Sequence, residues 1–183
     1  MAVWVAAAVP RVVGKYKAMT VRRLNKHLLF FPWRLRQIFT APVLTAIEHE
    51  IGASERQHMG QIRFAVEANL DFLSLLRGKT AHARALEVFT QLRVWDTEHN
   101  NGVLIYLLLA ERRVEIVADR GIHAKLDQTR WADICQRMQA SFRKGAFEAG
   151  VREGIREIGA HLAAHFPAAG ENANELSDQP VVL

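Results

Sequence analysis

The chain has 183 residues, of which 50% are hydrophobic and 23% are charged, so it can bury a core and is expected to form one soluble domain with tails. Its single cysteine, Cys135, excludes an internal disulfide and is typical of a reducing compartment. No apolar run approaches the roughly 20 residues of a membrane-spanning helix. The sequence therefore predicts a cytoplasmic protein, either free or peripheral to a membrane.

The basic charge is concentrated at one end of the chain. The net charge is +5, and eight basic residues from Arg11 to Arg36 precede the first acidic residue, Glu48. The rest of the chain holds 16 of the 24 basic residues against 19 acidic ones. An acidic core with no visible stacking platform argues against nucleic-acid binding.

The N-terminal part, residues 1–40, is predicted to be a basic extension and amphipathic arm. In residues 1–18 the positive charges follow the apolar segment, which argues against a secretory signal, and both Met1 and Met19 are candidate starts. A basic amphipathic helix is expected from Thr20 to Phe31, ended by Pro32. Two interpretations remain open: residues 11–36 bind an anionic membrane surface or a protein partner, or they form a strap whose arginines stay solvated.

The next segments alternate between helix and strand patterns. Pro42 suits the first turn of a helix that ends at Gly60, and alternation over 61–67 predicts a strand with one buried face. Residues 69–77 are compatible with a short strand or an irregular connector. Thr80 is then expected to cap a helix.

A β-hairpin is expected after that helix. The run 103–110 is apolar on both faces and predicts a strand covered on each side, whereas the alternating run 114–118 predicts a half-exposed strand. A turn centred on Glu111 and Arg112 would place Asn100 opposite His123 and Leu104 opposite Asp119.

Two helices and a tail complete the chain. Asp127 is expected to cap a helix that ends near Gly145, and a last helix is expected from Phe147 to Pro167. The order predicts an α/β fold, a three-layer α/β/α sandwich whose mixed sheet has a central antiparallel hairpin. The expected domain spans 41–166, and 167–183 are expected to form a disordered tail.

Several segments resemble the TPM domain family. The segment Asn101-Gly102-Val103-Leu104-Ile105 is similar to its acidic-Asn-Gly-Val-Leu-Leu strand, and Arg113-Val114-Glu115-Ile116 to its second strand. Gly121-Ile122 is similar to its Gly-Leu-Glu turn, and residues 142–147 to the junction of its last helices. The resemblance spans 41–166 and implies an α/β/α sandwich, with divalent-cation binding and phosphatase or nucleotide-hydrolysing activity in some members.

The family pattern is altered at three positions of the expected site. Asn100 stands where relatives have an acid, Asp119 replaces the first glycine of a Gly-X-Gly turn, and His123 stands where relatives have an acid. The resemblance therefore predicts the fold of this chain more strongly than it predicts an activity.

The ends of the hairpin strands, residues 96–102 and 119–123, form what we call the hairpin mouth, and they collect polar side chains. Oxygen ligands suit Ca²⁺ or Mg²⁺, and histidines suit Zn²⁺. The candidate metal ligands are Asp96, Glu98, Asn100 and Asp119; the candidate general acids or bases are His99 and His123; and Arg120 is the candidate phosphate-binding residue. The alternative is that these residues only cap turns and satisfy backbone groups.

Two functions are consistent with the sequence. The first is metal-dependent hydrolysis of a phosphate ester or nucleotide at the hairpin mouth. The second is a non-catalytic interaction module that associates with a membrane surface through its basic arm.

Overall fold

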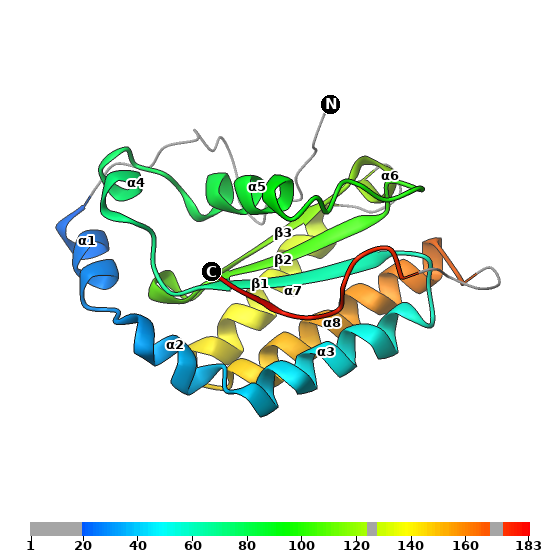
Figure 1. The fold of residues 1–183 in the computed structure, drawn as a ribbon, viewed down its shortest axis with the longest axis horizontal. Coiled ribbons are helices and arrows are strands. Elements are labelled where there is room, and N and C mark those ends of the chain that lie inside the picture. Colours follow the sequence, from blue (N-terminus) through cyan, green and yellow to red (C-terminus); the bar gives the residue numbers. More distant parts are fainter. Residues whose placement is uncertain (1–19, 124–127, 169–173) are drawn as a thin grey trace.

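The computed structural model describes residues 20–123, 128–168 and 174–183. Expectations for residues 1–19, including the choice between Met1 and Met19, and for Asp127 as a helix cap lie outside the described residues. The elements in chain order are α1 (Val21–Leu28), α2 (Pro32–Ile38), α3 (Ala41–Glu55), β1 (Gln61–Glu67), α4 (Phe72–Leu76), α5 (Ala81–Gln91), β2 (Gly102–Leu108), the 3₁₀ turn η1 (Leu109–Glu111), β3 (Arg113–Ala118), α6 (Arg120–His123), α7 (Gln128–Arg143), α8 (Phe147–His165) and β4 (Val181–Val182) (Figure 1).

The sheet lies between two layers of helices (Figure 1). Its strand order is β3-β2-β1-β4; β1 is parallel to β2 and β4, and β2 is antiparallel to β3. Helices α3, α7 and α8 cover one face, and α5 covers the other. The predicted three-layer sandwich with a mixed sheet is confirmed.

The apolar run of β2 explains its central place in the sheet. Val103, Ile105 and Leu107 pack into the core on the α3–α7–α8 side. Alternate residues of the same strand, including Leu104 and Tyr106, pack into the core on the α5 side. Because successive side chains of a strand point to opposite faces, a strand buried on both faces needs this uninterrupted apolar sequence.

The predicted hairpin register is wrong by two residues. Leu104 pairs with Val117, and Asp119 lies opposite Gly102, to whose carbonyl it donates its N–H at 2.9 Å. The turn takes up Leu109 as part of η1, and Arg112 closes it with φ 49° and ψ 40°. The centre of the turn therefore lies one residue earlier than the tight turn expected from sequence.

The burial of β3 also differs from the expectation. The strand was predicted to be half exposed, yet Val114–Ala118 are all buried. Glu115 is only 1% exposed, and it is held by Arg113 at 2.7 Å and His82 of α5 at 3.2 Å. An alternating polar residue is thus buried because an ion pair compensates the loss of its hydration.

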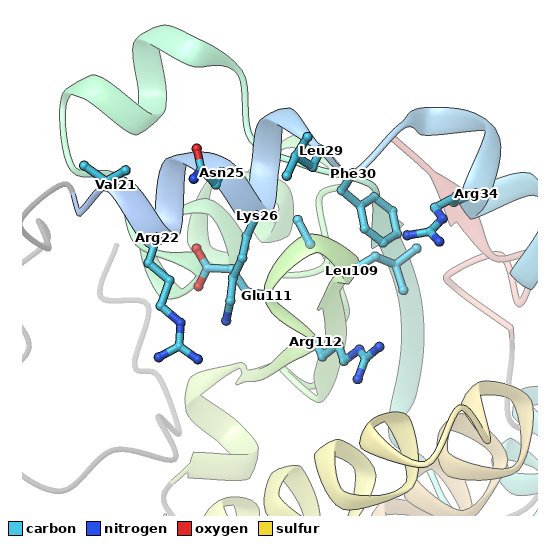
Figure 2. Close-up of a pocket in the computed structure, with 11 residues that line it drawn as sticks. Val21, Arg22, Asn25, Lys26, Leu29, Phe30, Arg34, Leu109, Glu111 and Arg112 are labelled. Carbon is cyan, nitrogen blue, oxygen red and sulfur yellow. The ribbon is translucent and has the colours of Figure 1, made fainter.

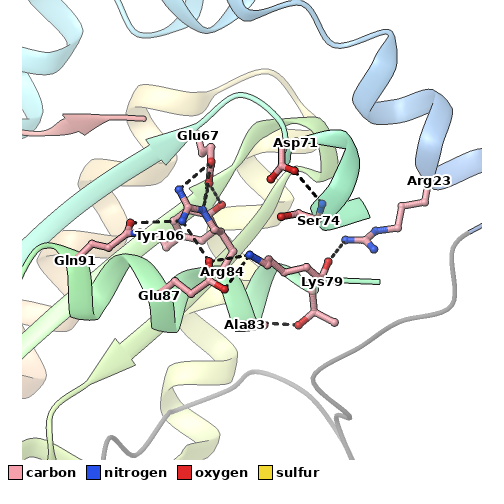
Figure 3. A network of polar contacts seen from close by, with 11 residues as sticks. Arg23, Glu67, Asp71, Ser74, Lys79, Ala83, Arg84, Glu87, Gln91 and Tyr106 are labelled. Atoms are coloured by element: carbon pink, nitrogen blue, oxygen red, sulfur yellow. Dashed lines mark hydrogen bonds and ion pairs between the residues drawn. The ribbon is translucent and has the colours of Figure 1, made fainter. Parts of the chain in front are cut away.

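Polar groups bind α5 to the sheet on the same face (Figure 3). The Tyr106 hydroxyl donates to Glu67 at 2.5 Å, and Arg84 of α5 donates to the same carboxylate at 2.9 Å. Burial, followed by the Glu67 carboxylate, raises the pKa of Tyr106, so its hydroxyl remains a donor. The strand β1, predicted to be covered on one face, is therefore covered on both.

The prediction of a disordered C-terminal tail is wrong for residues 174–183. Val181 and Val182 of β4 lie beside Ala65 and Val66 of β1, and Leu183 donates its N–H to Val66 at 2.9 Å. The Gln61 side chain accepts two further N–H groups of the tail at 3.0 and 3.1 Å. Such a strand is held by backbone hydrogen bonds, which leave no hydrophobic period in the sequence.

The stability of the protein should depend on pH through Glu55, which lies beside the C-terminal tail. This carboxyl is 6% exposed and accepts the Ile62 N–H at 2.6 Å. Burial, aided by the Asp178 carboxylate of the tail, raises the pKa of Glu55 from 4.5 to about 8. The folded protein therefore keeps a proton that the unfolded chain has lost, so stability should fall as the pH rises from 4.5 to about 8.

Replacing Glu55 by glutamine is expected to remove this pH dependence. The amide keeps the acceptor for Ile62 and can donate to Asp178, so Glu55→Gln should raise the free energy of unfolding near pH 9 by about 1 to 3 kcal/mol and change it little near pH 5. Urea unfolding at both pH values measures this. Glu153→Gln, on the exposed side of α8, is the control, and an unchanged pH slope in Glu55→Gln would contradict the assignment.

Candidate functional site

Two glycines let the chain segments of the hairpin mouth approach each other closely. A Cβ on Gly102 would lie 1.9 Å from the Val94 carbonyl oxygen, and a Cβ on Gly121 would lie 2.6 Å from the Asn100 carbonyl oxygen. The Gly121 N–H donates to the same Asn100 oxygen at 3.0 Å. Asn100 thus faces Gly121, whereas the sequence placed it opposite His123.

Three of the predicted site residues lie together at the mouth. Arg120 donates its side-chain Nε to Asn100 Oδ1 at 2.8 Å and its backbone N–H to Asp119 Oδ1 at 2.7 Å. Asp119 is 4% exposed, and its Oδ2 has no hydrogen-bond partner among the described residues. Burial raises the pKa of Asp119, against the opposing effects of the Arg120 N–H and charge.

The other predicted residues are more dispersed. Asp96, Glu98 and His99 are exposed, and His123 is half-buried. The Glu98 N–H donates to the Glu175 carboxylate of the tail at 2.8 Å. Within the ranges that the structure describes, no three His, Cys, Asp or Glu residues are grouped as a metal site would need. At the mouth, the buried carboxylate oxygen Asp119 Oδ2 lacks a hydrogen-bond partner among the described residues.

At the end of the molecule opposite the hairpin mouth, two basic side chains of α1 are buried against the hairpin turn. Arg23 and His27 of α1 are buried, and both contact the same oxygen, Oε1 of Glu111, at 2.7 and 2.9 Å. Burial opposes the charge of Glu111, but the bonds from His27 and Arg23 prevail and lower its pKa to about 2. Leu70 donates its N–H to His27 Nδ1 at 3.1 Å, so Nε2 is the ring nitrogen that carries the proton toward Glu111.

These contacts correct one interpretation of the N-terminal arm, the strap whose arginines all stay solvated. The arm does pack on the domain as a strap, but Arg23 is 6% exposed and is not solvated. Arg23 also donates to the Lys79 carbonyl at 2.6 Å, which joins α1 to the segment after α4 (Figure 3). Other cations of the arm, including Arg22, Lys26, Arg34 and Arg36, are exposed.

Exposed apolar side chains gather at the same end. The ten large hydrophobic residues that are exposed in the described ranges are Val21, Leu28, Leu29, Phe31, Trp33, Phe72, Leu73, Leu76, Val182 and Leu183. They belong to α1, the start of α2, α4 and β4. Because β1, β2 and β4 are parallel, their carboxyl ends lead to this one end, seen at the left of Figure 1. We call it the apolar basic end.

The positive charge of this end is not balanced by exposed acids. Six exposed basic residues lie on α1, on α2, after α4 and in the hairpin turn: Arg22, Lys26, Arg34, Arg36, Arg77 and Arg112. The exposed acid among the described residues there is Asp71, which caps α4 by accepting the Ser74 N–H at 2.9 Å. Sequence reasoning left α4 undecided, although an Asp cap before Phe-Leu-Ser-Leu-Leu is a helix signal.

A pocket of about 710 Å³ opens between α1 and the hairpin turn (Figure 2). Its basic lining residues are Arg22, Lys26, Arg34 and Arg112, and Glu111 is the acid among them. Leu29, Phe30 and Leu109 supply apolar walls. In the described ranges, none of the helices has the length and apolar character that crossing a membrane would require.

Comparisons with known proteins place this architecture in a family. The family model for the TPM domain matches residues 35–161. Among solved structures, the chain is similar to the BA42 protein of the psychrophilic bacterium Bizionia argentinensis, solved by NMR, with 28% identity and a TM-score of 0.70 over 79% of this chain and 94% of that one. No curated protein matches the chain. The matched residues include the whole sheet except β4, together with α3 and α7, so the chain belongs to the TPM domain family.

Proposed function

We propose that the protein is an interaction module that docks on an anionic membrane surface through its apolar basic end. The observation that supports this most strongly is that all ten exposed large hydrophobic residues of the described ranges lie at the end that also carries six exposed cations. Soluble proteins rarely leave large apolar patches uncovered unless the patch binds something. Apolar side chains interleaved with arginine and lysine suit the boundary between lipid headgroups and acyl chains.

The energy of such docking comes from two sources. Each cation near an anionic leaflet contributes about 1 kcal/mol, and this attraction weakens with salt. Inserting a few of the side chains Phe31, Trp33, Phe72 and Leu76 adds about 1.5 to 3 kcal/mol for each one that becomes fully buried. Neither contribution alone gives firm binding, whereas their sum does, so binding should need both the charges and the apolar groups.

A vesicle assay with charge-matched variants tests the proposal. The double variant Arg22→Gln/Lys26→Gln should weaken binding to phosphatidylserine-containing vesicles by roughly thirtyfold, because it removes two cations that each contribute about 1 kcal/mol. Arg56→Gln/Arg130→Gln removes the same charge at exposed positions on α3's C-cap and α7 and should bind like the wild type. Sedimentation with vesicles at low and high salt measures both. Equal losses in the two variants, or binding to neutral vesicles alone, would count against docking by this end.

Hydrolysis of a phosphate ester at the hairpin mouth is a second candidate. The observation in its favour is the buried Asp119, whose Oδ2 lacks a partner among the described residues and lies in the same cluster as Arg120 and Asn100. The family model that matches the chain also carries the word phosphatase in its name. A bound divalent cation would supply charge neutralisation there, while Arg120 would orient the phosphate.

Asp119→Asn separates this candidate from a purely structural role of the mouth. The amide keeps the acceptor for the Arg120 N–H, so stability should change little, while amide shifts near residues 100 and 119–123 on adding Mg²⁺, Ca²⁺, Mn²⁺ or Zn²⁺ should disappear together with any turnover of p-nitrophenyl phosphate. Asp133→Asn, an exposed acid on α7, is the control. Wild-type protein that shows neither cation shifts nor turnover would remove the candidate.

A further inference from the structure

The pocket beside α1 has the size and the lining of a headgroup site. Its volume of about 710 Å³ falls in the range of small-molecule pockets, about 300 to 1,000 Å³. It is bounded by α1, by the approach to α2 and by the turn after β2 (Figure 2). Arg22 and Lys26 come from one turn of α1, and Arg112 comes from the hairpin, so cations from two distant segments meet around one space.

The cations of the pocket have no side-chain partner among the described residues. The side chains of Arg22, Lys26, Arg34 and Arg112 form no hydrogen bond or ion pair with the residues that the structure describes. Glu111, the acid of the pocket lining, already binds Arg23 and His27 through one oxygen. By contrast, Arg84, Arg137 and Arg152 elsewhere in the fold all pair with carboxylates. The pocket thus keeps positive charge available for an external anion.

Arg112 is held in a backbone conformation that a glycine or asparagine would adopt at lower cost. Its φ of 49° lies in the left-handed region, which costs a non-glycine residue about 1 kcal/mol. The conformation closes the four-residue turn 109–112 and leaves the guanidinium at the rim of the pocket. A strained residue whose side chain lines a cavity is a reason to look for a ligand.

The apolar walls favour an amphiphilic ligand over a small soluble anion. Leu29 and Phe30 line the pocket, and the exposed Phe31 and Trp33 follow directly in the chain. A phosphate held by the cations would therefore sit next to side chains suited to acyl chains. A guanidinium matches phosphate oxygens with two parallel hydrogen bonds, and several unpaired cations favour a phosphate that carries two charges.

We propose that the pocket lined by Arg22, Lys26, Arg34 and Arg112 binds the terminal phosphate of an anionic phospholipid headgroup. This inference rests on the proposed membrane docking and deepens it, because it adds recognition of one headgroup to attraction by charge. The phosphate would contact the cations while Phe31 and Trp33 enter the surrounding acyl region. Docking would then orient the sheet with the carboxyl ends of β1 and β2 toward the membrane.

The test compares two glycine substitutions that change charge and backbone strain equally. Arg112→Gly removes one of the four pocket cations and suits the left-handed turn, so the variant should fold. Arg93→Gly makes the same change at φ 51°, at an exposed position between α5 and β2 near the hairpin mouth. Both variants and the wild type are sedimented with vesicles containing phosphatidic acid, which has a terminal phosphate, or phosphatidylserine, at equal surface charge.

We expect wild-type protein and Arg93→Gly to prefer phosphatidic acid by at least about fivefold, and Arg112→Gly to lose that preference while still binding both vesicles through the remaining charges. Binding without any headgroup preference would overturn the pocket and leave the docking function intact. No binding to either vesicle would overturn both. Equally strong binding of free glycerol phosphate, seen as amide shifts around Arg112 without vesicle binding, would overturn the lipid as the source of the phosphate.

Discussion

Gly102→Ala is expected to destabilise the protein by about 3 kcal/mol or more, at the upper end of the cost of overpacking a core. The new methyl group would lie 1.9 Å from the Val94 carbonyl oxygen and 3.0 Å from the carbon of the same carbonyl. Both are backbone atoms, so no rotamer change can relieve the contact. Either β2 must move away from α5, or the turn after α5 must open, and both changes disturb the central strand of the sheet.

Gly145→Ala provides the matched control for this prediction. Gly145 has φ 82° and no atom within 4 Å of an added Cβ, so the substitution costs only backbone strain, about 1 to 2 kcal/mol. Urea unfolding followed by circular dichroism gives both free energies of unfolding. If Gly102→Ala lost no more stability than Gly145→Ala, the close approach of β2 to Val94 would be refuted.

Glu111→Ala is expected to release the N-terminal arm from the domain. The substitution leaves Arg23 and His27 buried without their shared carboxylate, and breaking a buried ion pair costs about 3 to 5 kcal/mol. Because Glu111 is 19% exposed, we expect a value near the lower limit. The loss should be local: amide hydrogen exchange should rise across α1 and α2 while the sheet stays protected.

The same anchor sets the behaviour of the arm in acid. Because the folded pKa of Glu111 is about 2 and its ordinary value is 4.5, its contribution is complete above pH 4.5 and is lost as the pH falls toward 2. The control is Glu148→Ala, whose partner Arg152 is 38% exposed, so that surface pair should contribute no more than about 0.5 kcal/mol. Protection of α1 that survives in Glu111→Ala would show that contacts other than the Glu111 ion pair hold the arm.

Much of the fold could be predicted from short-range patterns. The uninterrupted apolar run of β2 identified a strand with two covered faces, and Pro42 marked the start of α3. The errors arose where backbone geometry or distant partners decide the outcome. A 3₁₀ turn closed by Arg112 shifted the register, and a remote histidine, His82, allowed Glu115 to be buried on β3.

The candidate sites also divide into features set by local pairing, which the sequence predicts, and features set by distant segments, which it does not. The sequence brought Asn100 and Asp119 to one end of the hairpin because antiparallel pairing is local, and the structure places both at the mouth. It could not bring Phe72 and Val182 together with α1, because that convergence follows from the parallel pairing of β1 with β2 and β4. Parallel pairs join segments far apart in the chain and leave no turn signal.

The position of β4 has a consequence for how this member of the family is built. The residues matched by the family model, 35–161, stop short of α1 on one side and of β4 on the other. A chain trimmed to those residues would leave the backbone of β1 unpaired at Ala65 and Val66, on the kind of sheet edge that recruits other chains. The C-terminal extension therefore covers that edge with β4, and the N-terminal extension adds α1 at the neighbouring end of the molecule.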